Sequence, residues 1–310
     1  MSTTPVCEQH KGPVLSSANG YDIIDCEACG FAHITPLPTI EQLEKIYAEE
    51  FYATTEPVYI DRYKEDRPWW DLVYNDRYDS FEQMVPAGSR RLLDIGSGPG
   101  LFLLRGKERG WDVLGIEPSR QACEYSRSLG LEVLSEFFDR DLAPKLGRFD
   151  VIHLSLVLEH LPDPAETLRL CQSLLAPHGI LCVTVPNEYN PFQTLAYQQL
   201  QPPTPWWLCP PHHINYFNSK SLENVMKRSG FDVVLGESTF PVEMFLLMGD
   251  NYAGNDQVGR SIHRKRMLFE TGLATAGLSH IKRSLYQHMH TLGVGRESTV
   301  YGRPCPSPTA

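Results

Sequence analysis

The residues best suited to holding a ligand form a turn at positions 94–100, with Gly96, Gly98 and Gly100 at alternate positions. Glycine adopts positive φ angles readily, so the backbone of such a turn can approach a ligand closely. Glu117 ends the next apolar run, where a carboxylate can accept both hydroxyl groups of a ribose. The glycine spacing differs from the usual dinucleotide fingerprint, and no Lys-Ser/Thr pair of a P-loop follows it. Taken together, the turn and the carboxylate indicate a site for a ligand that contains a ribose.

A second group of reactive residues lies near the start of the chain, where Cys7 pairs with His10 and Cys26 pairs with Cys29. Two residues separate the members of each pair, and fifteen residues separate the pairs. Each short turn can aim two ligands at one tetrahedral Zn²⁺ ion. Because four protein ligands leave no open coordination position, the spacing predicts a structural zinc rather than a catalytic one. The alternative is a knuckle without metal that keeps free thiols.

The glycine turn belongs to a segment in which strand-like and helical patterns alternate. Short apolar runs typical of strands lie at 91–95, 112–116, 132–134, 149–154, 180–185 and 231–236. Helical spacing of apolar residues occurs at 101–109, 121–129, 164–175 and 221–228. This alternation predicts an α/β fold, with a mostly parallel sheet covered by helices on both faces. Ligands of such folds bind beyond the carboxyl ends of the strands, near the switch in strand order.

The pattern divides the chain into four regions. They are a zinc-ribbon-like module at 1–35, a helical aromatic lid or connector at 36–85, a Rossmann-like ligand-binding core at 86–240 and a C-terminal extension at 241–310. The extension is expected to hold one helix around 260–292 and a closing strand around 298–303, which brings the sheet to seven strands. Five prolines between positions 202 and 211 predict a loop over a site rather than a linker.

Composition narrows the class of protein. The formal net charge of −10 over 310 residues disfavours a general nucleic-acid-binding protein, which usually has a basic face. No apolar run reaches the roughly 18 residues of a membrane span, and no secretory signal pattern is seen. Cys123, Cys171 and Cys182 lie in apolar-patterned elements and are expected to be buried. A cytoplasmic enzyme with reduced thiols is therefore expected.

Three segments of the predicted core together resemble the class I methyltransferases that use S-adenosylmethionine (SAM). Residues 93–100 resemble the first motif of that family, 149–164 its fourth-strand motif and 175–186 the segment entering its fifth strand. The resemblance spans 86–236 and implies a Rossmann-like methyltransferase fold with SAM as the cofactor. The same alternation would also suit a Rossmann-like oxidoreductase or epimerase.

The resemblance implies roles for individual residues around SAM. The glycines would line the methionine part, Asp94 would orient the loop or the amino group, and Glu117 would hold the ribose. Adenine would lie close to Glu136 and Phe137, and Ser155 would offer its backbone. The residues expected to bind the cofactor are Asp94, Gly96, Ser97, Gly98, Gly100, Glu117, Glu136, Phe137 and Ser155.

The early cysteines resemble a subset of these methyltransferases, many of them from sugar or surface-glycan pathways. That subset carries a small zinc ribbon, then a Pro-Thr-x-x-x-Leu segment like residues 38–43, then an aromatic helix. The first ligand pair of the subset is usually Cys-Cys, so His10 is a departure. Imidazole is nonetheless a good zinc ligand.

Three histidines are candidates for activating the acceptor. The SAM leaving group becomes neutral and needs no acid, whereas a hydroxyl or acidic carbon acceptor needs a base, and histidine is the usual one. His160 follows the fourth strand, where the family commonly faces the acceptor. His212 and His213 lie in a polar, aromatic loop after the fifth strand, whose end at 187–189 is expected to reach the same cleft. The alternatives are a loop-bonding role for His160 and a loop packed by its own aromatic residues for the pair.

The resemblance favours a small acceptor that is a sugar, nucleotide-sugar or glycan unit. A quinone, phenolic or other secondary metabolite is the alternative, because the region of His160 also resembles quinone-pathway methyltransferases. A tRNA or protein methyltransferase, or a SAM-binding subunit without activity, is less favoured. Aromatic residues at 59–78 form either a lid over SAM or core packing, and basic residues at 260–283 form either a phosphate site or a solvated helix face.

Overall fold

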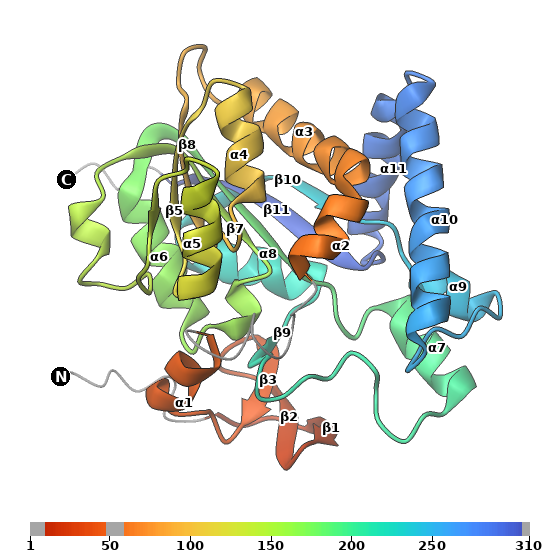
Figure 1. The fold of residues 1–310 in the computed structure, drawn as a ribbon. Coiled ribbons are helices and arrows are strands. Elements are labelled where there is room, and N and C mark those ends of the chain that lie inside the picture. Colours follow the sequence, from red (N-terminus) through yellow and green to blue (C-terminus); the bar gives the residue numbers. More distant parts are fainter. Residues whose placement is uncertain (1–9, 48–58, 306–310) are drawn as a thin grey trace.

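A computed structural model describes residues 10–47 and 59–305 (Figure 1). The strands are β1 (Val14–Ala18), β2 (Tyr21–Cys26), β3 (Phe31–Thr35), β4 (Arg91–Ile95), β5 (Asp112–Ile116), β6 (Val133–Leu134), β7 (Phe149–Ser155), β8 (Leu175–Pro186), β9 (Asn215–Tyr216), β10 (Phe231–Ser238) and β11 (Glu297–Pro304). The α-helices are α1 (Ile40–Lys45), α2 (Tyr59–Glu65), α3 (Arg67–Met84), α4 (Leu101–Glu108), α5 (Arg120–Ser128), α6 (Pro164–Leu174), α7 (Pro191–Leu200), α8 (Ser219–Arg228), α9 (Glu243–Leu247), α10 (Asp256–Thr275) and α11 (Ser279–Thr291). The described residues also form the 3₁₀ helices η2 (Ala143–Lys145) and η3 (Leu158–His160).

The larger sheet has seven strands in the order β10-β11-β8-β7-β4-β5-β6. Strands β8, β7, β4, β5 and β6 run parallel, while β11 pairs antiparallel with both β8 and β10. The chain order reverses between β4 and β7, and this switch opens a ligand position at the carboxyl edge. The α/β prediction with a mostly parallel, seven-stranded sheet is therefore confirmed, and the closing strand β11 lies inside this sheet.

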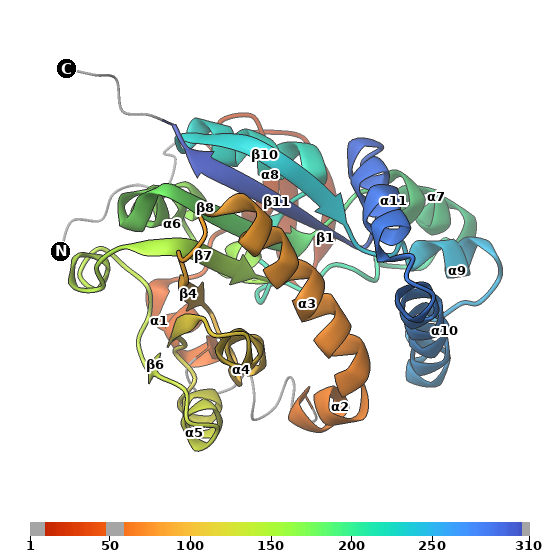
Figure 2. The ribbon, with the colours of Figure 1, turned by 90° about the horizontal axis from the view of Figure 1, so that it is seen from above.

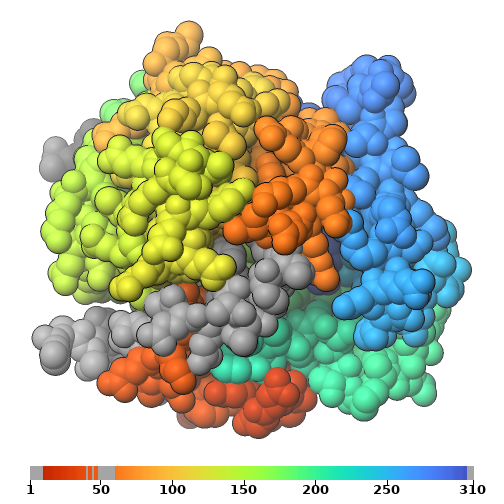
Figure 3. All heavy atoms as spheres, in the orientation of Figure 1, coloured from red at the N-terminus to blue at the C-terminus, as the bar shows by residue number. Residues whose placement is uncertain are grey.

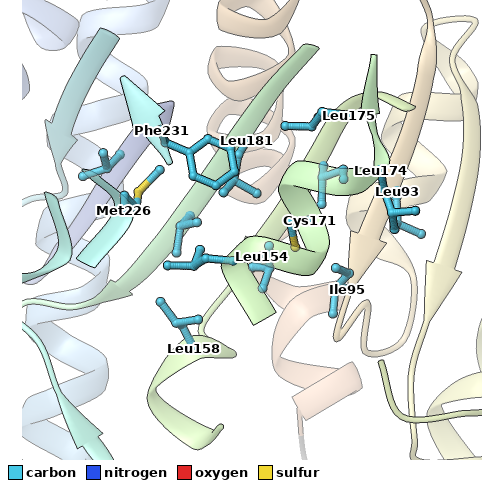
Figure 4. Packing of buried hydrophobic residues seen from close by; sticks show 14 of the residues in the cluster. Leu93, Ile95, Leu154, Leu158, Cys171, Leu174, Leu175, Leu181, Met226 and Phe231 are labelled. Carbon is cyan, nitrogen blue, oxygen red and sulfur yellow. The ribbon is translucent and has the colours of Figure 1, made fainter. Parts of the chain in front are cut away.

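Helices cover the larger sheet on both faces (Figure 2). Alternation along β4 explains the two layers, because neighbouring side chains of a strand point to opposite faces. Leu92 packs in one buried cluster with residues of α3, α4 and α5. Leu93 and Ile95 pack in the other, with residues of α6 and α8 (Figure 4). The predicted burial of Cys123, Cys171 and Cys182 in these layers is confirmed.

A second sheet of four strands, in the order β1-β2-β3-β9, lies below the carboxyl edge of the larger sheet in Figure 1. Its first three strands come from the N-terminal segment, whereas β9 comes from the proline-rich segment after β8. Ala32 pairs with Tyr216, and His33 pairs with Asn215. The N-terminal module is thus joined by backbone pairing to the loop that carries the two adjacent histidines.

The C-terminal segment contains two helices where the sequence predicted one helix over 260–292. Helix α10 ends before Gly277, which has a φ of 73°. The N–H of Leu278 donates to the carbonyl of Leu273, which closes the helix end with a glycine cap. Periodicity continues through this turn, so the apolar pattern alone did not reveal the break. The two helices lie along one flank of the molecule (Figure 3).

Buried aromatic residues and ion pairs attach these helices to α3. Trp69 of α3 is buried and donates to Glu270 of α10. Basic residues of the C-terminal helices meet acidic partners, as in Arg260 with Asp66 at 2.7 Å. These contacts favour core packing over a lid for this part of the aromatic stretch. They also show that basic side chains of the C-terminal helices form ion pairs within the protein. Within residues 10–47 and 59–305, no helix is long and apolar enough to cross a lipid bilayer.

Candidate active site

The glycine turn connects β4 to α4 at the carboxyl edge of the larger sheet. Gly96, Gly98 and Gly100 have φ angles of 71°, 52° and 75°. A Cβ atom at Gly96 would lie 2.4 Å from the side chain of Val157, and one at Gly100 would lie 2.7 Å from that of Ser126. Both distances are shorter than van der Waals contact, so the turn requires glycine for space as well as for its backbone angles.

The carboxylate of Glu117, directly after β5, lies against this turn. It accepts hydrogen bonds from the N–H of Gly98 at 2.9 Å and from the N–H of Ser119 at 2.8 Å. Burial raises the pKa of Glu117 to about 7, although these two hydrogen bonds oppose the shift. Each carboxylate oxygen has two lone pairs, so each can also accept a hydroxyl group of a ligand.

Asp94 points away from the turn, into the layer beneath it. Its Oδ1 lies 2.8 Å from Nδ1 of His153 on β7, and the ring of Phe102 stacks on that imidazole with centroids 4.1 Å apart. Burial lowers the pKa of His153, although Asp94 opposes the shift, so the neutral imidazole donates its Nδ1–H to the carboxylate. Asp94 therefore ties β4 to β7 below the turn. The sequence analysis did not single out His153, because one histidine inside an apolar strand carries no distinctive pattern.

The other predicted cofactor residues differ in exposure. Ser97 is buried, and its hydroxyl has no hydrogen-bond partner among the described residues. Glu136 and Phe137 follow β6 and are exposed, and Ser155 is exposed at the end of β7. Leu156 comes next, with a φ of 56° and 42% of its surface exposed. A positive φ is uncommon for leucine and is typical of strained positions at functional sites.

Glu159, His160 and His213 converge near the ends of β7 and β8, and we call them the acceptor-side cluster. One ligating atom from each lies within 4.8 Å of the corresponding atoms of the other two. Nε2 of His160 is 3.8 Å from Oε1 of Glu159, and the two imidazole rings have centroids 5.0 Å apart. The structure thus brings together His160 and His213, which the sequence analysis proposed separately, and adds Glu159.

Tyr47 and the backbone of His212 hold the imidazole of His160. Nδ1 of His160 is 2.7 Å from the carbonyl oxygen of His212, and the hydroxyl of Tyr47 donates to the same carbonyl at 2.5 Å. Because a carbonyl only accepts, Nδ1 carries the hydrogen and Nε2 keeps its lone pair. Tyr47 lies within the predicted aromatic region, but nothing in its spacing distinguishes it from its neighbours.

Burial sets the protonation state of both histidines. It lowers the pKa of His160 to about 3 and that of His213 to about 4. The nearby imidazole of His213 lowers the pKa of His160 further, and the charge of Arg296 lowers that of His213. Both imidazoles are therefore neutral near pH 7 and offer lone pairs.

Further buried charges surround the acceptor-side cluster. Nδ1 of His213 lies 3.5 Å from Oε1 of Glu188, and Arg296 lies 3.3 Å from Glu243. Burial raises the pKa values of Glu159 and Glu188 well above the usual range. The sequence analysis placed Glu188 near the cleft, but it missed Arg296 and Glu243, which approach from the C-terminal region through folding alone.

Asn215 connects the acceptor-side cluster to the N-terminal sheet. Its amide nitrogen donates to the carbonyl oxygens of Leu158 at 3.2 Å and Leu161 at 2.8 Å, on either side of Glu159 and His160. Its backbone pairs with His33 in the smaller sheet. The position of η3 is thus set partly by β9.

His10, Cys26, Cys29 and His33 form a second group, which we call the N-terminal cluster. Nδ1 of His10 lies 3.7 Å from each of the two sulfur atoms, and the four ligating atoms lie within 4.8 Å of one another. Nδ1 of His33 donates to the carbonyl of Ile34 at 2.8 Å, and its buried Nε2 has no hydrogen-bond partner among residues 10–47 and 59–305. Cys7, the fourth predicted ligand, lies outside the described residues. His33 was missed because it falls outside both short pairs, on a strand.

The sequence of residues 70–235 matches the family model of a methyltransferase domain. This match covers more than half of the chain, and the sheet carries the Rossmann-like strand order of class I methyltransferases. The chain belongs to this methyltransferase domain family.

Two similar curated proteins are ubiquinone biosynthesis O-methyltransferases. The one from Ralstonia nicotianae is 30% identical over 144 residues, which is 41% of this chain and 60% of that protein. The one from Caulobacter sp. is 36% identical over 110 residues, which is 34% of this chain and 44% of that protein. The chain thus spans three fifths or less of the length of these relatives. A solved SAM-dependent methyltransferase from Archaeoglobus fulgidus is 18% identical, with a TM-score of 0.49, and the match covers 79% of this chain and 99% of that one.

Proposed function

We propose that this protein transfers the methyl group of SAM to a hydroxyl oxygen of a small phenolic or quinone-type acceptor. The observation that carries the proposal is the shared position of two sites. The glycine turn, Glu117, and the Glu159–His160 part of the acceptor-side cluster all follow strands of the larger sheet at its carboxyl edge. That edge is where ligands of doubly wound folds bind.

The cofactor half of the proposal rests on the turn. Gly96, Gly98 and Gly100 let the backbone approach the methionine part of SAM, and Glu117 accepts the ribose hydroxyls. Asp94 supports the turn from below through His153. The exposed ring of Phe137 after β6 offers an apolar surface to adenine. Ser97 and Ser155 complete the set, with Glu136 beside Phe137.

The acceptor half rests on a buried cluster of neutral imidazoles and carboxyl groups. Methyl transfer forms an O–CH₃ bond while the S–CH₃ bond breaks, so the acceptor must lose its hydroxyl proton. Nε2 of His160 and the imidazole of His213 present lone pairs, and His212 contributes the carbonyl that orients His160. The names of the relatives favour a phenolic acceptor over the sugar or glycan unit expected from the sequence.

We also propose that the N-terminal cluster binds a structural zinc ion. Two thiols and two imidazoles form a donor set that Zn²⁺ favours. The carbonyl of Ile34 orients His33 so that Nε2 is available as a ligand, as outer-shell partners do in zinc sites. The sequence predicted Cys7, His10, Cys26 and Cys29 as the ligands, and His33 is the alternative to Cys7 for the fourth position.

The test of the methyltransferase proposal is a transfer assay with methyl-labelled SAM. We expect label in catechols and hydroxylated quinone precursors, but not in a panel of nucleotide sugars. Calorimetry should detect SAM binding without acceptor. Label in the sugars alone would overturn the acceptor class, and absence of SAM binding would overturn the whole proposal.

A further inference from the structure

The acceptor-side cluster has the composition and spacing of a metal site. Glu159, His160 and His213 supply one carboxylate oxygen and two imidazole nitrogens, all within 4.8 Å of one another. Glu159 and His160 belong to η3, whereas His213 lies just before β9. Two distant segments of the chain therefore bring their ligating atoms close together.

Several carboxyl oxygens of this region have no hydrogen-bond partner among the described residues. Glu159 is 1% exposed, and neither of its carboxylate oxygens has a hydrogen-bond partner among the described residues. Oε2 of Glu188 and Oε2 of Glu243 also have no hydrogen-bond partner among these residues. Arg296 lies 3.3 Å from Glu243, and its charge opposes the rise in the pKa of Glu188. Buried carboxylates are normally paired, hydrogen-bonded or bound to a metal, so a cationic ligand would complete this region.

The histidines are held in the form that binds metals. His160 donates Nδ1–H to the carbonyl of His212, which leaves the lone pair of Nε2 beside Glu159. A second-shell carbonyl on one nitrogen is the usual arrangement of a metal-binding histidine.

We propose that Glu159, His160 and His213 bind a divalent transition-metal ion that receives the hydroxyl oxygen of the acceptor. This inference rests on the proposed function and names how the same site activates its substrate. Two imidazoles and one carboxylate suit Zn²⁺, Mn²⁺ or Fe²⁺ better than Mg²⁺ or Ca²⁺, which prefer oxygen ligands. Three protein ligands leave coordination positions open for water or substrate.

The chemistry needs no further reactant. The acceptor oxygen replaces a metal-bound water, and its O–H pKa falls because the ion stabilises the oxyanion. The proton passes to water. The oxyanion then attacks the methyl carbon of SAM, so that one O–C bond forms, one C–S bond breaks and the sulfonium becomes a neutral thioether.

Titration of the full chain with Mn²⁺, followed by electron paramagnetic resonance, tests the site. Mn²⁺ prefers oxygen and nitrogen ligands, so it selects this cluster over the cysteine-containing N-terminal cluster. We expect one tightly bound Mn²⁺ per chain. Loss of an outer-shell partner alone weakens metal binding 10–100-fold, so Glu159→Gln and His213→Gln should each weaken it by more than about 100-fold. Glu243→Gln, which removes a neighbouring buried carboxylate outside the three ligands, should leave the affinity within about threefold.

Two further measurements keep the outcomes separate. SAM affinity, measured by calorimetry, should be unchanged in each variant, which shows that the fold is intact. The variant His213→Asp supplies a different ligand at the same position and should recover Mn²⁺ binding. Equal Mn²⁺ affinity in wild type and Glu159→Gln, or full transfer to catechol after chelation of the enzyme, would overturn the metal site and leave the methyltransferase proposal standing. Mn²⁺ binding without SAM binding would overturn the proposed function instead.

Discussion

The N-terminal cluster and the acceptor-side cluster differ in donor atoms and in how folding assembles them. The first combines two sulfurs with two imidazoles inside residues 10–33, and the second combines one carboxylate with two imidazoles from residues 159–213. Sulfur-rich sets with four protein ligands close around zinc, whereas three-ligand nitrogen and oxygen sets leave open positions. Under the two metal proposals, the chain would use a closed cluster for structure and an open cluster for chemistry.

Strand pairing and hydrogen bonds also connect the two clusters. His33 of the N-terminal cluster pairs with Asn215 across β3 and β9, and Asn215 holds the carbonyls of Leu158 and Leu161 around the second cluster. A change in the N-terminal cluster should therefore reach the acceptor side, while the glycine turn lies on other strands. Variants of each element test whether the two sides act independently.

The largest effect is expected from Cys26→Ser. We expect loss of about one zinc equivalent and a fall of at least ~3 kcal/mol in the free energy of unfolding, since structural zinc binding is worth about 10–16 kcal/mol in small finger peptides. Metal analysis and denaturant unfolding measure the two effects. Cys305→Ser, at a cysteine outside the cluster, is the matched control. Full zinc content and unchanged stability in Cys26→Ser would remove the structural role.

His160→Ala and His213→Ala should come next and should affect turnover rather than folding. Groups that move or polarise the acceptor proton contribute about 10²–10⁴-fold to rate. We expect a loss of that size in transfer to a catechol, with SAM affinity unchanged. Near-wild-type turnover in both variants would exclude these residues from the chemistry.

Glu117→Gln tests the independence of the cofactor side. A hydrogen bond to a charged group is worth about 1.5–3 kcal/mol, so SAM affinity should fall about 10- to 100-fold. In the free protein the pKa of Glu117 is raised to about 7, so protonation below that pH removes the negative acceptor. SAM affinity should therefore rise between pH 6 and pH 8, and Glu117→Gln should flatten this rise. Calorimetry at several pH values measures both, and a pH profile that is identical in the variant would contradict the ribose role.

The smallest effect is expected from Asn215→Ala, which cuts the connection between the clusters. Loss of two hydrogen bonds to carbonyls should lower the free energy of unfolding by about 1–3 kcal/mol. We expect slower transfer, with zinc content and SAM affinity retained. Asn224→Ala, at an exposed position of α8, is the control. Transfer at the wild-type rate in Asn215→Ala would show that the clusters act separately.

Local sequence patterns predicted much of the fold. The strands at 91–95 and 112–116 have the predicted bounds, because each is a short apolar run that ends at a turn residue. The glycine turn was identified because its function depends on backbone conformation, which residue type largely decides. The Cys26 and Cys29 pair was identified for a similar reason, since both ligands come from one tight turn.

Local sequence patterns did not predict the long-range contacts. The helical pattern continued past Gly277, where a cap ends α10. The pairing of β9 with β3 joins two short strands that are separated by most of the chain, so the periodicity of apolar residues does not predict it. Tyr47 and Arg296 reach the acceptor side for the same reason.

The α/β class, the glycine turn and the Cys26–Cys29 pair of the N-terminal cluster can be predicted from the sequence, because each depends on neighbours along the chain. The approach of His33 to that cluster, and of Glu159 to His213, follows from the tertiary structure alone. Burial then sets their chemistry, because removing water raises the pKa values of the carboxyl groups and lowers those of the imidazoles. Such an environment is a property of the packed protein and of no single segment.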